Sequence, residues 1–179
     1  MGREGPRNIG QNVVLILILC GAVLCCLTAG GCGYTFATTP LSDEYRTIAV
    51  PAFKNQTFEP DLQIRFNNIL VRELENDGRL RIVDDPATAD LVLSGVLTVF
   101  DPHAISFVAD DEIGQFRISI AATAALEAVR EGETLWQEEA VWGSDFYLTS
   151  GGRMREDAID EALEELAENI IHGALDNYW

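Results

Sequence analysis

The chain has 179 residues and carries 29 acidic against 12 basic side chains, which gives it a formal net charge of −17 at pH 7. A surface with this charge repels a phosphate backbone, so the composition excludes nucleic acid as a partner. The length suits one domain with a substantial hydrophobic core.

The first 34 residues have the pattern of an export signal. Arg3 and Arg7 precede an apolar run at residues 13–27, which is short for a membrane span of roughly 20 residues. Thr-Ala-Gly-Gly follows at 28–31, and these small residues suit cleavage between Gly31 and Cys32. We therefore expect a lipoprotein signal peptide at 1–31, a lipid on Cys32 and a lipidated tether at 32–44. An uncleaved transmembrane anchor is the alternative that the pattern leaves open.

The cysteine distribution agrees with this interpretation. Cys20, Cys25 and Cys26 lie inside the expected signal peptide, so cleavage leaves Cys32 as the only thiol of the chain. An oxidising compartment usually selects paired cysteines or none. A single thiol at the cleavage site is chemically stable there when it is acylated.

Residues 45–179 predict one α+β domain, which begins with a strand at 46–50 and a turn at 53–57. Pro60 is expected at the first position of a helix, where its missing N–H costs nothing. Gly78 is placed to cap the C-terminus of this helix. The apolar side chains at helical spacing are Leu62, Phe66, Ile69, Leu70 and Leu74.

The second half of the domain predicts three more strands and a long helix. A short β-type segment at 80–83 precedes a long strand at 90–100, and an irregular stretch is expected from 101 through 114. Residues 116–129 are assigned as strand despite their alanine content, because Glu131-Gly132-Glu133 predicts a hairpin turn. Trp136 and Trp142, in the returning arm, are expected on one face. The apolar stripe of the last helix extends from Ala158 to Ala174.

The order strand, helix, strand, strand, strand, helix predicts a two-layer sandwich. The first and second strands flank a crossover helix, so we expect them to be parallel neighbours, and an antiparallel meander should follow. Both helices can then cover one face of a mixed four-stranded sheet.

The sequence is poor in the groups that catalysis requires. His103 and His172 are the only histidines, and neither has a cysteine or second histidine nearby, so no usual zinc spacing exists. Adjacent acidic pairs such as Glu164-Glu165 lie on predicted turns or helix surfaces, whereas glycosidase carboxylates face each other across a cleft. No nucleophile elbow or phosphate-binding glycine loop is present. We expect no enzyme activity, no catalytic residue, no metal and no cofactor apart from the lipid.

Several segments occur in a family-specific order. They are Gly31-Cys32-Gly33-Tyr34, the run IAVPAFKNQT at 48–57, EPDL at 59–62, ADLVLSG at 89–95 and the long C-terminal helix. Their order and spacing resemble the LptE family of lipopolysaccharide-assembly lipoproteins. The resemblance implies a lipoprotein on the periplasmic side of the outer membrane that acts as plug and assembly partner of the LptD barrel in lipopolysaccharide transport to the cell surface.

Two further expectations follow from resemblance. LptE proteins touch lipopolysaccharide through basic residues, and Arg117, Arg153 and Arg155 are the candidates for such a phosphate contact here. The chain also resembles lipoproteins that activate peptidoglycan synthases, and those of the curli-secretion type, in its first strand and its ADLVLSG segment. The alternative function is therefore that of an accessory lipoprotein in another envelope machine.

Overall fold

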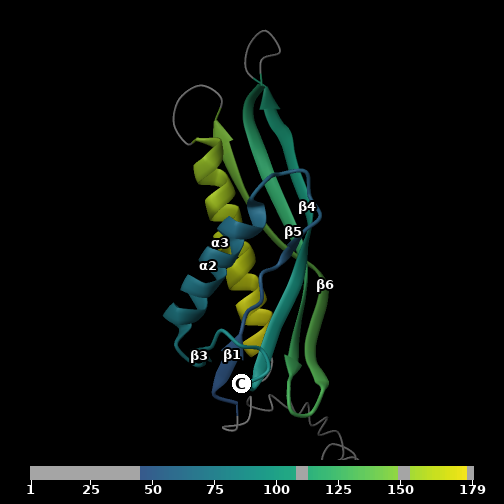
Figure 1. Cartoon of the computed structure of the whole chain (residues 1–179). Coiled ribbons are helices and arrows are strands. Elements are labelled where there is room, and N and C mark those ends of the chain that lie inside the picture. The colour runs from purple at the N-terminus through teal and green to yellow at the C-terminus, as the bar shows by residue number, and fades with distance from the viewer. Residues whose placement is uncertain (1–44, 108–112, 149–153, 177–179) are drawn as a thin grey trace, which may run out of the picture. The chain divides into compact units, whose positions relative to one another are not determined.

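The computed structural model describes residues 45–107, 113–148 and 154–176. The expected signal peptide, cleavage site, Cys32 and tether lie outside the described residues. The domain contains the strands β1 (Thr47–Ala49), β2 (Lys54–Asn55), β3 (Arg81–Ile82), β4 (Leu91–Phe107), β5 (Ile113–Ala128) and β6 (Glu133–Leu148) and the helices α2 (Leu62–Asp77) and α3 (Arg155–Leu175) (Figure 1).

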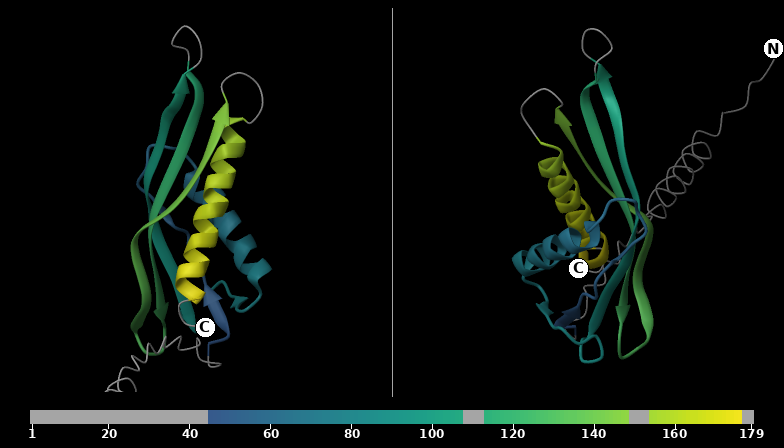
Figure 2. Two further views of the ribbon diagram at one scale, coloured as in Figure 1. Left: turned by 180° about the vertical axis from the view of Figure 1, so that it is seen from behind. Right: turned by 45° about the horizontal axis from the view of Figure 1, so that its top comes forward.

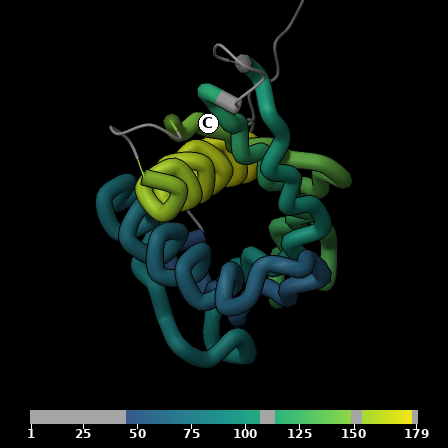
Figure 3. The backbone as a smooth tube through the Cα atoms, turned by 90° about the horizontal axis from the view of Figure 1, so that it is seen from above, coloured from purple at the N-terminus to yellow at the C-terminus, as the bar shows by residue number. Residues whose placement is uncertain are grey.

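The strands form one mixed sheet with two helices on one face. Their order is β3-β1-β4-β5-β6, and β2 also pairs with β4. β1 is parallel to β4, and β4, β5 and β6 form an antiparallel meander, as predicted. A view from above shows α2 and α3 on the same side of the long strands (Figure 3). The two-layer α+β class is confirmed, and the sheet exceeds four strands because the two-residue strands β2 and β3 extend it.

Helix α2 forms where the apolar spacing predicts it, and all five predicted apolar side chains are buried. Gly78 has φ +70°, and its N–H donates to the Leu74 carbonyl at 3.2 Å, as expected of a C-terminal cap. The expectation for Pro60 is wrong. Asp61 is the N-cap residue, with φ +59°, so Pro60 lies in the turn before the helix.

Two glycines let the layers approach closely. A Cβ at Gly143 of β6 would lie 2.1 Å from the carbonyl oxygen of Ala162 in α3, and one at Gly95 of β4 would lie 2.3 Å from the Phe53 ring. Real side chains do not tolerate such contacts, so any larger residue would push α3 or Phe53 out of place. Figure 2 shows α3 running along β6.

The expectation of an irregular stretch is wrong for residues 101–107 and 113–114, which are strand, whereas residues 108–112 lie outside the described residues. β4 continues through Asp101, Pro102 and His103 to Phe107, and Pro102 pairs with Ile118 of β5. β1 and β2 pair with β4 only as far as Leu97, so the described sheet leaves the other edge of β4 unpaired beyond that point. Proline has no backbone N–H to donate, but no neighbouring strand needs that donor at this free edge, so Pro102 does not interrupt β4.

The two tryptophans of β6 do not share a face, contrary to the prediction. Trp136 pairs with Leu126 of β5 and packs against the core. Between Glu138, which pairs with Ala124, and Val141, which pairs with Ala122, β6 contains one more residue than β5. The bulge reverses the alternation of side chains. Trp142 therefore lies on the sheet face opposite the helices, with 50% of its surface exposed.

A buried carboxylate joins the starts of β1 and β4. The Asp90 carboxylate accepts hydrogen bonds from the Arg46 N–H at 3.0 Å and from the Thr47 N–H and hydroxyl at 3.0 and 2.8 Å. Arg130, in the β5–β6 turn, adds an ion pair at 3.0 Å. The pKa of Asp90 is lowered, chiefly by the hydrogen bond from the Arg46 backbone and then by that from the Thr47 hydroxyl. Charge on Asp90 therefore stabilises the fold.

We predict that Asp90→Asn lowers the free energy of unfolding at pH 7 by about 1–3 kcal/mol, because an amide NH₂ would replace an acceptor oxygen. Since the folded-state pKa is depressed, this stabilisation is present above the unfolded-state pKa of about 3.9 and is lost as pH falls through the folded-state value. Urea unfolding at pH 7 and pH 3 measures the free energy of unfolding of both proteins. The difference in this free energy between wild type and Asp90→Asn should be smaller at pH 3. Asp84→Asn, at an exposed position, is the control; an equal loss there would contradict the assignment.

Candidate functional site

Arg117 is the predicted contact residue that the fold presents to solvent. It lies in β5 next to Ile118, which is fully buried against the helix layer, so Arg117 faces the opposite side of the sheet. In register, it stands between His103 of β4 and Phe146 of β6. Among the described residues no carboxylate forms an ion pair with Arg117. Its guanidinium is therefore available to an external anion.

Exposed apolar side chains flank Arg117 on the same face. Trp142, Phe146 and Leu148 alternate along the edge strand β6 and are 50%, 43% and 41% exposed. We call these three residues, together with Arg117 and His103, the outer patch. The imidazole of His103 lies 3.3 Å from the Asp101 carboxylate. One free cation beside apolar side chains suits an amphiphile with an anionic head group.

The other two predicted contact residues differ from Arg117. The Arg155 guanidinium donates to both carboxylate oxygens of Glu59, at 3.1 and 2.7 Å, and lies 5.5 Å from the centroid of the Phe100 ring. The hydrogen bond with Glu59 is the main cause of its raised pKa. Arg155 thus anchors the start of α3 to the segment before α2. Arg153 lies outside the described residues.

Sequence reasoning missed a row of arginines that joins the two helices. Arg65, Arg72 and Arg79 are seven residues apart, so they share one side of α2 and the turn after it. Their partners lie in α3 and at its C-cap: Asp160 at 2.6 Å and Glu156 at 2.7 Å for Arg65, Glu164 at 2.6 Å for Arg72 and the C-cap Asp176 at 2.5 Å for Arg79. The partners advance with the arginines, so the helices run in the same direction. The regular seven-residue spacing of these arginines was the signal in the sequence from which the row could have been predicted.

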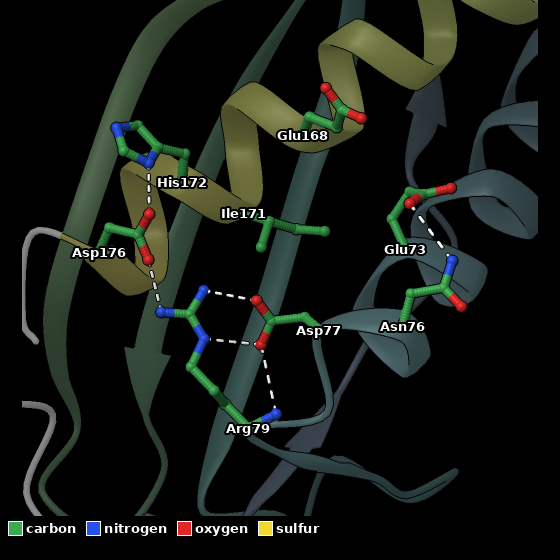
Figure 4. A pocket seen from close by; sticks show the side chains of 8 residues that line it. All are labelled: Glu73, Asn76, Asp77, Arg79, Glu168, Ile171, His172 and Asp176. Carbon is green, nitrogen blue, oxygen red and sulfur yellow. Dashed lines mark hydrogen bonds and ion pairs between the residues drawn. The ribbon is translucent and has the colours of Figure 1, made fainter.

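A hollow of about 330 Å³ lies between the C-terminal ends of α2 and α3 (Figure 4). Arg79 occupies its floor, with two 2.6 Å hydrogen bonds to Asp77 and one of 2.5 Å to Asp176. His172 contacts the second oxygen of Asp176. The pKa of Arg79 is raised, chiefly by Asp77, and that of Asp176 is lowered, chiefly by Arg79. Arg79 is shared between Asp77, at the end of α2, and Asp176, the C-cap of α3, so the hollow is a helix junction.

The acidic pair in α3 has two separate structural roles. Glu164 binds Arg72, whereas Glu165 accepts a hydrogen bond from the Ser144 N–H of β6 at 2.6 Å. Within residues 45–107, 113–148 and 154–176, no group of three or more metal-ligating side chains occurs. In that same part of the chain, no helix is both long and apolar enough to span a membrane.

Comparison with protein families identifies residues 45–172 as a match to the LptE model, described as lipopolysaccharide-assembly. The chain belongs to the LptE family. This match covers every described strand, all of α2 and α3 as far as residue 172, and it agrees with the resemblance in the sequence. Comparison with curated proteins finds no match.

Solved structures share the fold of this LptE family member at low sequence identity. A protein from Xanthomonas campestris has a TM-score of 0.57 and 10% identity, covering 74% of this chain and 85% of its own. A hypothetical protein from Chlamydia trachomatis has a TM-score of 0.54 and 13% identity, covering 71% and 94%. At these identities the likeness shows the fold alone.

We predict that the arginines of this LptE domain contribute unequally to stability. Arg79→Met should lower the free energy of unfolding by about 1 kcal/mol, because Asp77 and Asp176 would lose their shared cation in a partly buried network. Arg72, whose side chain is 50% exposed, should be replaceable by Met without a measurable change. Urea unfolding in 0.05 and 1 M NaCl measures both, and a larger loss for Arg72→Met would contradict the ranking.

Proposed function

We propose that this protein is a lipoprotein of the outer membrane, anchored on the periplasmic side by a lipid on Cys32, that acts as plug and assembly partner of an LptD-type barrel in lipopolysaccharide transport. The single observation that carries the proposal is the LptE family match over residues 45–172. The lipoprotein-type signal at 1–31 supports the anchor, and residues 45–179 would form the working domain.

The distribution of charge supports a role in binding without turnover. Arg65, Arg72, Arg79 and Arg155 are each engaged with carboxylates of the same domain. These arginines stabilise the fold, and because arginine stays protonated at physiological pH they do not act as general acids or bases. We therefore propose that the protein is not an enzyme, and that it requires no metal or cofactor beyond its lipid.

Purification of the acylated full-length chain from detergent-solubilised outer membranes tests the partner. We expect a very large β-barrel protein to co-purify in a fixed ratio. A penicillin-binding protein in its place would support the alternative role in peptidoglycan synthesis. Recovery of the lipoprotein without either partner would reject the proposed assembly.

We predict that Cys32→Ala abolishes acylation, because the thiol is the attachment point, and removes the protein from the outer-membrane fraction. Mass spectrometry of the N-terminal peptide and membrane fractionation measure the two effects. Cys26→Ala is the matched control and should leave both unchanged. A Cys32→Ala protein that stays membrane-embedded through an intact N-terminal span would refute the lipid anchor.

We further propose that the outer patch contacts lipopolysaccharide, with Arg117 binding a phosphate and the β6 side chains lying along an acyl chain. Arg117→Ala should weaken binding to purified lipopolysaccharide about tenfold, because one charge-assisted hydrogen bond would be lost. Arg155→Ala should leave binding within about twofold, since its guanidinium is held by Glu59. Arg153→Ala belongs in the same series. Binding that survives replacement of all three arginines would exclude this contact.

A further inference from the structure

The turn between β2 and α2 presents a phenylalanine entirely to solvent. Phe58 is 103% exposed, the highest value among the large hydrophobic side chains of the described residues. Isolated exposed apolar residues are common on protein surfaces. Phe58 differs because the backbone on both sides of it is held in place.

The Asn55 side chain organises this turn. Its Oδ1 accepts hydrogen bonds from the N–H and hydroxyl of Thr57, at 2.9 and 2.8 Å. Its Nδ2 donates to the Glu59 carbonyl at 2.8 Å and to Gln63 at 3.0 Å. β2 itself pairs with β4, and Glu59 is fixed by Arg155 of α3. A ligand of Phe58 would not need to order the loop, which lowers the entropy cost of binding.

Two more exposed apolar side chains belong to the same end of the helix layer. Ile64 is 54% and Met154 is 68% exposed. Ile64 precedes Arg65, which binds Glu156, and Met154 precedes Arg155, which binds Glu59. These ion pairs bring the starts of α2 and α3 together. We call Phe58, Ile64 and Met154 the helix-start patch.

The charge around the helix-start patch is negative. The carboxylates at the starts of the two helices are Glu59, Asp61, Glu156, Asp157 and Asp160, against the two cations Arg65 and Arg155. A bilayer surface that carries anionic lipid would repel this rim, and burying its carboxylates in hydrocarbon would be costly. A protein pocket with an apolar floor and a basic rim complements both the charge and the aromatic side chain.

We propose that the helix-start patch docks on the barrel partner, with Phe58 inserted in an apolar pocket of that protein that is bordered by basic side chains. The inference rests on the proposed function, because it assigns the contact through which that partner is held. Phe58 acts as the anchor, and Ile64 and Met154, at the same end of the helix layer, add exposed apolar area to the contact.

Affinity for the purified, detergent-solubilised barrel tests the contact with the full acylated chain. Phe58→Ala should weaken binding about 10- to 30-fold, as expected of an aromatic anchor, and should leave thermal unfolding unchanged because the side chain is exposed. Phe146→Ala is the matched control, a partly exposed phenylalanine of the outer patch, and should remain within about twofold of wild type. Raising the salt concentration should weaken wild-type binding, since the rims carry opposite charge.

A photo-crosslinking phenylalanine analogue at position 58 in living cells gives an independent measurement. We expect the crosslinked product to contain the barrel protein. Crosslinks to lipid alone, or equal barrel affinities for wild type and Phe58→Ala, would overturn the inference while leaving the assembly itself intact. A wild-type chain that does not bind the barrel would overturn the proposed function and this inference together.

Discussion

The helix layer is joined to the sheet where α3 crosses the middle of β6. Gly143 allows the α3 backbone to approach, and side chains four residues apart in α3 then bind the edge of the strand: Glu165 accepts from the Ser144 N–H and Asn169 donates to the Trp142 carbonyl at 2.9 Å. β6 is the last strand in the sheet order, so these bonds satisfy backbone groups that a further strand would otherwise pair. The contact positions α3 and protects the edge.

The position of α3 determines that of α2. Once α3 lies against β6, its carboxylates form a row that the arginines of α2 can reach. The apolar faces of both helices then pack into the same hydrophobic core. Apolar burial supplies the stabilisation, while the ion pairs contribute register and direction, since exposed pairs add little energy. One consequence is that five cations of this acidic domain are used internally: Arg65, Arg72, Arg79, Arg130 and Arg155. Arg117 is among the described cations that are not used in this way.

Local patterns in the sequence predicted the elements better than the contacts between them. The apolar positions of α2, the Gly78 cap and the strand at residues 116–129 depend on neighbours within a few residues, and all three are confirmed. The extension of β4 through Pro102 depends on which strand edges are paired, and the separation of Trp136 from Trp142 depends on one extra residue in β6. Neither is visible in hydrophobic periodicity, which reports faces only where the register is regular.

The candidate contact residues show the same limit. Arg117 and Arg155 look alike in the sequence, but Glu59, 96 positions away from Arg155, engages one of them and leaves the other exposed. The sequence pattern likewise does not mark the fully exposed Phe58, which follows the turn predicted at residues 53–57, because this segment is ordered by side-chain hydrogen bonds from Asn55.

The two exposed surfaces have different chemistry, which matters for the proposed role. The outer patch combines a cation with apolar side chains on a strand edge, and the helix-start patch combines an aromatic side chain on an ordered turn with a negative rim. A protein held inside a pore must bind its wall without binding its cargo by the same surface, since a shared surface would make the two compete. The acidic rim of the helix-start patch would repel the anionic ligand proposed for Arg117, which directs that ligand to the outer patch. The proposed plug role would therefore require an ordered domain with two selective surfaces.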